Sequence, residues 1–231
     1  YGERIQRLVG HSSHVNSVSS ALESRGMLAS GSDDSTCRIW DARSRYAVRT
    51  LPQPYACTAV ELSADGSRLF AGGIDNVVRV YDLRKGDDQS AVAITLDGHQ
   101  DTITGVRLSP DGSYLLSHSM DNTVRSWDVR PFVAADSRMV KLFLGAQQNY
   151  EKNLLRCAWD PSGQRVAAGS SDWFVYAWDV QSGKIAYKLP GHRGCVNEVD
   201  FHPTQPIIAS GSSDKTIYLG EIEAASEASA S

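Results

Sequence analysis

Short stretches of alternating apolar and polar residues run along the whole chain, and turn-forming residues separate them. Val106 and Leu108 precede one such turn, and Tyr114 and Leu116 follow it. Turn sequences containing Asp, Pro or Gly occupy the same phase at residues 63–66, 109–112 and 160–163. A period of two residues predicts strands, and no segment keeps a helical period. The pattern therefore predicts an all-β fold.

A longer repeat lies on top of this alternation. The similar segments are GSDDSTCRIWD ending at Asp41, GGIDNVVRVYD ending at Asp82, HSMDNTVRSWD ending at Asp128, GSSDWFVYAWD ending at Asp179 and GSSDKTIYLGE ending at Glu221. Each contains one aspartate at a predicted turn, which we call the turn aspartate: Asp34, Asp75, Asp121, Asp172 and Asp214. They are 41, 46, 51 and 42 positions apart, which is close to the length of a four-stranded propeller blade.

A correlation within the chain links a histidine, a serine and the turn aspartate. Three repeats begin with Gly-His, at His11, His99 and His192. The same three carry a serine four residues before the turn aspartate: Ser30, Ser117 and Ser210. The two repeats without that histidine have Ala71 and Ala168 there. Because a buried imidazole needs partners for both nitrogens, this pattern predicts one hydrogen-bonded network per blade.

These residues resemble the WD-repeat family, in which His, Ser, Asp and Trp form a structural tetrad. The resemblance implies tetrads at His11, Ser30, Asp34 and Trp40, and at His99, Ser117, Asp121 and Trp127. The third would keep His192, Ser210 and Asp214, with Leu219 in the tryptophan position. The implied fold is a β-propeller over residues 1–223 with four antiparallel strands per blade. We expect five repeats of a seven-bladed ring, N-terminal blades missing, and residues 1–9 as the outer strand of a preceding blade.

Within the family, the chain is similar to the WD-repeat subunits of a spliceosomal particle, the U-five small nuclear ribonucleoprotein. Two stretches that a propeller does not require carry this resemblance: WDVRPF at 127–132 and EKNLLRC at 151–157. It implies a nuclear, non-catalytic scaffold that acts in pre-mRNA splicing. Its implied partners are proteins, namely the large scaffold protein and the RNA helicase of that particle.

Composition narrows the classes of partner and cofactor. The chain has 231 residues and a formal net charge of −4, so we expect RNA to be contacted only indirectly or by minor contacts. Its four cysteines are widely spaced, which predicts reduced, mostly buried thiols and no zinc site. We expect no cofactor, no membrane association and no small-molecule substrate, because no motif for any of them occurs. Residues 224–231, of sequence AASEASAS, predict a disordered tail.

Two features exceed what a propeller framework needs and are candidates for partner binding. The connection from Pro131 to Lys152 is long and contains Phe132, Phe143 and Tyr150. Long connections in compact domains are either functional or plain insertions, and the sequence leaves both open. Trp173 and Phe174 follow a turn aspartate where other repeats have small or polar residues, so we expect Trp173 to be exposed at a turn tip. Packing of Trp173 onto a neighbouring blade is the alternative.

Little in the sequence favours an enzyme or a metal-binding protein. His11 and His14 form an H-x-x-H pair, but no third ligand lies nearby in the sequence, which favours a structural histidine. The turn aspartates recur in every repeat, whereas a catalytic carboxylate pair must converge at one place. A propeller hydrolase is therefore disfavoured. The other alternative to a splicing scaffold is the substrate receptor of a ubiquitin ligase, which an adaptor-binding motif and a basic channel mouth would favour.

Overall fold

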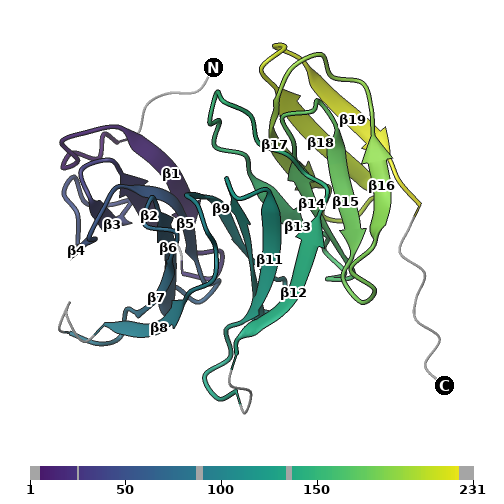
Figure 1. The fold of residues 1–231 in the computed structure, drawn as a ribbon. Helices are drawn as coiled ribbons and strands as arrows, with labels where there is room; N and C mark the ends of the chain where they lie inside the picture. Colours follow the sequence, from purple (N-terminus) through teal and green to yellow (C-terminus); the bar gives the residue numbers. More distant parts are fainter. Residues whose placement is uncertain (1–5, 25, 87–90, 134–136, 224–231) are drawn as a thin grey trace. The chain divides into compact units, whose positions relative to one another are not determined.

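The computed structural model describes residues 6–24, 26–86, 91–133 and 137–223, and these residues form strands, turns and loops without a helix (Figure 1). The strands fall into five antiparallel sheets. The prediction of an all-β fold built from five repeats is therefore confirmed. No helix in the described residues is long and apolar enough to cross a membrane.

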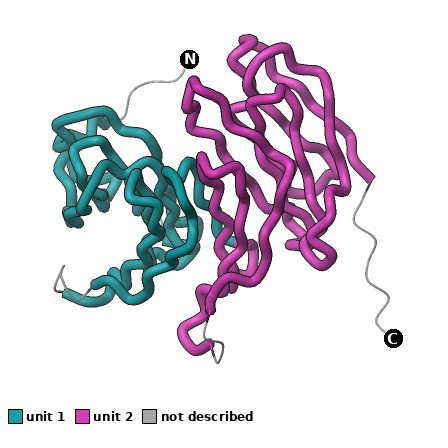
Figure 2. The backbone as a smooth tube through the Cα atoms, viewed as in Figure 1, with its two compact units in different colours: residues 1–108 teal, residues 109–231 magenta. Residues whose placement is uncertain are grey.

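The backbone divides into two compact units, residues 1–108 and 109–231 (Figure 2). The strands of the first unit are β1 (Val15–Ser20), β2 (Met27–Ser32), β3 (Thr36–Asp41), β4 (Arg49–Pro52), β5 (Cys57–Leu62), β6 (Arg68–Gly73), β7 (Val78–Asp82), β8 (Val92–Leu96) and β9 (Ile103–Leu108). They give one sheet in the order β1-β2-β3-β4 and a second in the order β5-β6-β7-β8. Within each sheet, strands that are consecutive in the sequence pair antiparallel.

The second unit repeats this arrangement. Its strands are β10 (Tyr114–Ser119), β11 (Thr123–Asp128), β12 (Met139–Leu144), β13 (Cys157–Trp159), β14 (Arg165–Gly169), β15 (Val175–Asp179), β16 (Ile185–Leu189), β17 (Val196–Phe201), β18 (Ile207–Ser212) and β19 (Ile217–Glu221). β10, β11 and β12 pair antiparallel in that order, and β13 to β16 form a four-stranded sheet. The last sheet has three strands, β17-β18-β19, within the described residues.

Apolar cores lie between successive sheets of each unit. In the first unit, Leu51, Val60 and Leu69 are buried in one cluster. In the second unit, Phe143 and Trp178 share a cluster, with ring centroids 5.9 Å apart. Inner strands such as β5 and β15 are buried along nearly their whole length, because sheets cover both of their faces. The outer strands β4 and β12 instead bury one side chain between exposed neighbours.

Every turn aspartate stands in a turn with the same backbone geometry. The residue after it has a positive φ in all five repeats: Ser35 (59°), Asn76 (67°), Asn122 (64°), Trp173 (74°) and Lys215 (69°). In the first repeat, Asp34 Oδ1 accepts hydrogen bonds from the Thr36 backbone N–H at 3.0 Å and its hydroxyl at 2.6 Å. The aspartate is thus needed to close the turn, which explains why it recurs.

Two expectations about the connections need correction. The connection from Pro131 to Lys152 is not one long loop, because β12 lies inside it and supplies the outer strand of its sheet. Residues 6–9 form no strand, and the Val9 N–H instead donates to the Arg45 carbonyl at 3.0 Å. Residues 1–5 and the expected tail at 224–231 lie outside the described residues.

Candidate functional site

The first repeat contains a continuous chain of side-chain hydrogen bonds. The Trp40 indole N–H donates to Ser30 Oγ at 2.8 Å, and Ser30 Oγ lies 2.6 Å from His11 Nε2. His11 Nδ1 lies 2.8 Å from Asp34 Oδ2. Since a carboxylate can only accept, His11 donates from Nδ1, and with a neutral ring its Nε2 accepts the Ser30 hydroxyl proton. Each polar atom along this path therefore has a partner.

Asp34 is the charged end of this network. Burial alone would raise the pKa of its carboxyl group, but hydrogen bonds from Thr36, His11 and the Ser12 backbone outweigh burial. The pKa of Asp34 is therefore held well below its usual value. A carboxylate with so low a pKa stays ionised at neutral pH, which suits an acceptor that fixes a turn and not a proton donor.

The last repeat keeps most of the network. His192 Nδ1 lies 3.0 Å from Asp214 Oδ2, and His192 Nε2 lies 2.9 Å from Ser210 Oγ. The hydrogen bond from the Thr216 side chain is the largest of several causes that hold the pKa of Asp214 far below its usual value. The residue at the tryptophan position, however, is Gly220 and not Leu219. Trp40 pairs with Leu28 on the adjacent strand, and the equivalent pair is Gly220 with Ile208.

Leu219 is one residue out of register with that position, and its side chain is 73% exposed. Neighbouring side chains of a strand point to opposite faces, so Leu219 cannot take the place of Trp40. Instead the Tyr218 ring packs on His192, with ring centroids 4.5 Å apart. Ser210 therefore has no indole donor from the tryptophan position of its own repeat.

The middle network is partly described. The Trp127 indole N–H donates to Ser117 Oγ at 2.7 Å, and Asp121 Oδ1 accepts the Thr123 hydroxyl at 2.6 Å. His99 is buried and belongs to the first unit, whereas these four residues belong to the second.

The two repeats without the histidine use other partners that the sequence reasoning missed. In the second repeat, Gln53 stands four residues before the first residue of β5, as His11 does before β1. Its Oε1 accepts the hydroxyl of Tyr81, the residue at the tryptophan position, at 3.0 Å. In the fourth repeat, the Tyr176 hydroxyl donates to Asp172 at 2.7 Å, and Lys188 lies 3.4 Å from the same carboxylate. Counting back four residues from each strand would have identified Gln53.

The H-x-x-H pair has no room for a metal ion. Both ring nitrogens of His11 are engaged, by Asp34 and Ser30, while the His14 side chain is 90% exposed. Within the described residues, no three His, Cys, Asp or Glu side chains are grouped as metal ligands would be.

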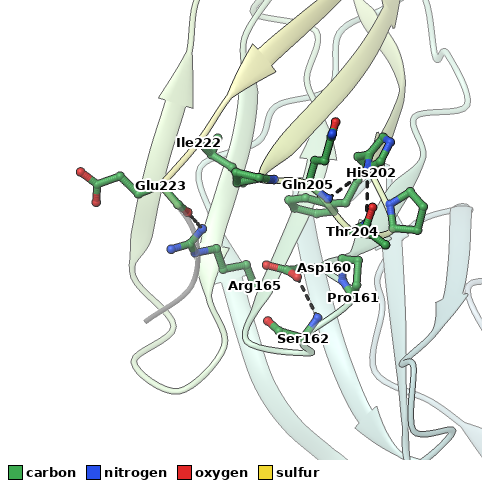
Figure 3. Close-up of a pocket in the computed structure, with 12 residues that line it drawn as sticks. Asp160, Pro161, Ser162, Arg165, His202, Thr204, Gln205, Ile222 and Glu223 are labelled. Carbon is green, nitrogen blue, oxygen red and sulfur yellow. Dashed lines mark hydrogen bonds between the residues drawn. The ribbon is translucent and has the colours of Figure 1, made fainter. Parts of the chain in front are cut away.

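A pocket of about 220 Å³ lies between the first turns of the fourth and fifth sheets (Figure 3). Its polar groups serve the local backbone. His202 Nδ1 accepts the N–H groups of Thr204 at 3.2 Å and Gln205 at 3.0 Å, and Asp160 accepts the Ser162 N–H at 2.8 Å. The pocket is therefore a depression formed by turns, which the side chains of His202 and Asp160 cap.

The aromatic candidates for partner binding separate into exposed and buried residues. Phe132 is 95% exposed, Tyr150 is 91% exposed and Trp173 is 54% exposed. Phe143 is fully buried on β12 and packs against Trp178, so it cannot contact a partner directly and the candidate is withdrawn. Phe174 is half-buried, and the Lys188 ammonium lies 4.1 Å from its ring centre.

Tyr150 and Trp173 lie at the same end of the fourth sheet, where β14 turns into β15. The Ser171 N–H donates to the Gln147 carbonyl at 2.8 Å, and the Gln147 N–H donates to Ser170 Oγ at 2.9 Å. The loop from Gly145 to Arg156 is thereby fastened to the turn that carries Trp173. We call the exposed side chains of Tyr150 and Trp173 the Tyr150–Trp173 surface.

Further bonds fix the same loop. The Gln148 N–H donates to Asn122 Oδ1 at 2.6 Å, and the Gln148 side chain donates to the Asn153 carbonyl at 2.9 Å. His118, fully buried on β10, lies 3.2 Å through Nδ1 from the Leu155 carbonyl oxygen. Tyr150 is therefore presented to solvent by a loop with a defined conformation.

Comparison with known proteins identifies the architecture. The sequence profile of the family described as WD domain, G-beta repeat matches residues 2–41, 46–82, 91–128, 145–179 and 183–219. The chain belongs to the WD40 repeat family. The resemblance stated from the sequence is thus confirmed, and each sheet is a WD40 blade.

Several curated WD40 relatives cover nearly all of this chain. The U5 small nuclear ribonucleoprotein 40 kDa protein of Homo sapiens is 52% identical over 96% of the chain and 61% of its own length. The protein of the same name in Dictyostelium discoideum is 54% identical over the same shares. The pre-mRNA-splicing factor cwf17 of Schizosaccharomyces pombe is 48% identical over 96% of the chain and 63% of its own length. The chain thus spans about three fifths of these relatives.

In the WD40 framework Trp173 is an unusual residue. Its position requires a positive φ, and the other four repeats have Ser, Asn, Asn and Lys there. Left-handed backbone is unfavourable for bulky L-residues, and asparagine tolerates it best after glycine. Trp173 therefore carries a local conformational cost, and its half-exposed ring recovers only part of the burial that an interior tryptophan would gain.

Proposed function

We propose that this protein is a non-catalytic interaction subunit of a spliceosomal ribonucleoprotein and acts in pre-mRNA splicing in the nucleus. The relatives named above support the particle: two are U5 small nuclear ribonucleoprotein proteins and one is a splicing factor. We expect its partners to be proteins, namely the large scaffold protein and the RNA helicase of that particle, with RNA contacted only in a minor way.

The observation that carries the scaffold role is the Tyr150–Trp173 surface. Aromatic side chains exposed on a fixed framework are favoured anchors in protein interfaces. Tyr150 is held outward by a hydrogen-bonded loop, and Trp173 occupies a backbone position that disfavours it. Backbone strain that the fold does not require is found preferentially at functional sites. The turn aspartates support the non-catalytic part of the proposal, because their oxygens serve turns and structural histidines.

The test is a pull-down from nuclear extract with the tagged protein, washed at moderate salt, with the recovered proteins and RNAs identified. We expect the spliceosomal scaffold protein, the helicase and the U5 RNA. Recovery of ubiquitin-ligase adaptors, or of no splicing component, would contradict the proposal.

A second arm compares single variants of exposed aromatic residues. Tyr150→Ala should lower the recovery of protein partners several-fold, because large interface anchors contribute about 2 kcal/mol or more each. Phe132→Ala is the matched control, since Phe132 is equally exposed but is not part of the Tyr150–Trp173 surface. Equal recovery of protein partners with both variants would contradict a binding role for the Tyr150–Trp173 surface. It would not contradict the proposal that the protein belongs to the spliceosomal particle.

A further inference from the structure

Two buried thiols meet between the first and second blades. Cys37 lies on β3 and Cys57 on β5, and their Sγ atoms are 3.3 Å apart. Both residues are at most 2% exposed and share one apolar cluster of the first unit. Neither takes part in a turn-aspartate network.

The propeller framework does not require sulfur at either position. Cys37 pairs with Gly31 on the adjacent strand, and the equivalent pair in the second repeat is Val78 with Gly72. A Cβ at Gly31 would lie 2.6 Å from Cys57 Sγ, and one at Gly72 would lie 2.6 Å from Ile103 Cγ2. Cys37 and Cys57 therefore meet in the contact between the first and second blades. Val78 and Ile103 occupy the equivalent positions in the second and third repeats.

The contact between the fourth and fifth repeats also has aliphatic residues at the equivalent positions. Val175 and Val196 stand at the positions equivalent to Cys37 and Cys57, and both belong to one buried cluster. The third and fourth repeats place Val124 and Cys157 at these positions, in another buried cluster. Among the contacts described within one unit, two cysteines therefore meet only between the first and second blades. A pair of adjacent cysteines adds a chemistry that packing alone does not need.

We propose that Cys37 and Cys57 form a redox modification site, at which a peroxide oxidises the two thiols to a disulfide that links the first blade to the second. One thiolate attacks the peroxide, the O–O bond breaks, and a sulfenic acid and hydroxide form. The second sulfur then attacks the sulfenic sulfur, the S–S bond forms and the S–O bond breaks. In total, two thiols and one hydrogen peroxide give one disulfide and two waters.

Its environment makes the thiol pair slow to react with peroxide. The hydrogen bond with Cys57 and, after it, burial raise the pKa of the Cys37 thiol well above its usual value. Because the thiolate is the reactive form, oxidation should accelerate as the pH rises. The sulfur atoms need to approach by only about 1.2 Å to reach bonding distance, so the blades need little rearrangement.

The disulfide should stabilise the first unit measurably. It would join residues 20 positions apart in sequence and so restrict the unfolded chain. For a chain of this size, such a link should raise the melting temperature by roughly 5–10 °C. Addition of a thiol reductant should reverse the shift.

The experiment is peptide mapping of the folded full chain after treatment with hydrogen peroxide. The peroxide is then removed, and free thiols are alkylated as the protein is unfolded in denaturant, before it is cut with trypsin. Trypsin places Cys37 in peptide 26–38 and Cys57 in peptide 50–68, while Cys157 and Cys195 fall in other peptides. We expect a cross-linked pair of 26–38 with 50–68 that is lighter by two hydrogen atoms than the separate peptides and disappears on reduction.

Three variants make the outcome decisive. Cys37→Val and Cys57→Ile install residues that the chain itself uses at the equivalent positions, and both should abolish the cross-link and the rise in melting temperature. Cys157→Ala should retain both effects. Oxidation of Cys37 or Cys57 to sulfinic acid without a cross-link would overturn the proposal. So would survival of both thiols at a peroxide dose that fully oxidises glutathione, or pairing of either cysteine with Cys157 or Cys195.

Discussion

Replacement of Ser30 by alanine tests the hydrogen-bonded network of the first blade. The Ser30 hydroxyl accepts from the Trp40 indole at 2.8 Å and donates to His11 Nε2 at 2.6 Å. Ser30 and Trp40 are each at most 4% exposed. Ser30→Ala removes one oxygen and leaves two side-chain polar atoms, on Trp40 and His11, without that partner.

The magnitude follows from these two atoms. A polar group left without a partner in the interior costs about 1–3 kcal/mol, so two should cost about 2–6 kcal/mol. In a chain of this size that corresponds to a fall in melting temperature of roughly 5–15 °C. Urea unfolding, followed by tryptophan fluorescence at pH 7, measures the free energy directly.

Ser210→Ala is the matched control within the same chain. Ser210 is also buried and bonds His192 at 2.9 Å, but Gly220 at the tryptophan position supplies no indole. Only one group loses its partner, so the loss should be about 1–3 kcal/mol, roughly half that of Ser30→Ala. Equal losses for the two variants would refute the reasoning that the indole belongs to the network.

Three further predictions follow from single side chains. Asp34→Asn should make the free energy of unfolding depend less on pH under acidic conditions. Because the pKa of Asp34 is depressed in the folded protein, the ionised carboxylate stabilises the fold above about pH 4, and this stabilisation is lost as the pH falls further. Urea unfolding midpoints between pH 6 and pH 3 would measure the difference. Phe143→Ala should cost about 3–5 kcal/mol by creating a cavity, whereas Phe132→Ala should change the unfolding free energy by less than about 0.5 kcal/mol. Trp173→Asn should leave stability equal or raise it by up to about 1 kcal/mol, because asparagine tolerates the positive φ; a clear loss would mean that packing of the Trp173 ring outweighs the strain.

The fold could be predicted from the sequence because the repeat and the strand alternation agree. In four of the repeats the turn aspartate accepts the backbone N–H of the residue two positions later, so a local signal fixes a local structure. Local agreement of this kind makes the fold of a repeat protein predictable from its sequence. The prediction of Leu219 at the tryptophan position of the fifth repeat was wrong by one residue. Trp40 follows Asp34 by six positions, and the residue six positions after Asp214 is Gly220, as the strand pairing shows.

The candidate surface was only partly predictable. Phe132, Phe143 and Tyr150 look alike in sequence, but Phe143 falls on the inward face of β12 while the other two are exposed. The strand was missed because MVKLFL carries apolar residues on both faces, so alternation does not mark it. Gln53 was missed for a related reason, since its bond to Tyr81 joins residues 28 positions apart.

The most direct test compares a variant of a structural turn network with a variant of the exposed aromatic surface in one nuclear extract. Partner recovery is measured for the unmodified protein, Ser210→Ala and Trp173→Asn, at a temperature where unfolding curves show all three to be folded. We expect Ser210→Ala to recover spliceosomal proteins as the unmodified protein does, and Trp173→Asn to recover several-fold less. The reverse order would contradict the division between structural turn networks and an exposed aromatic surface that binds partners.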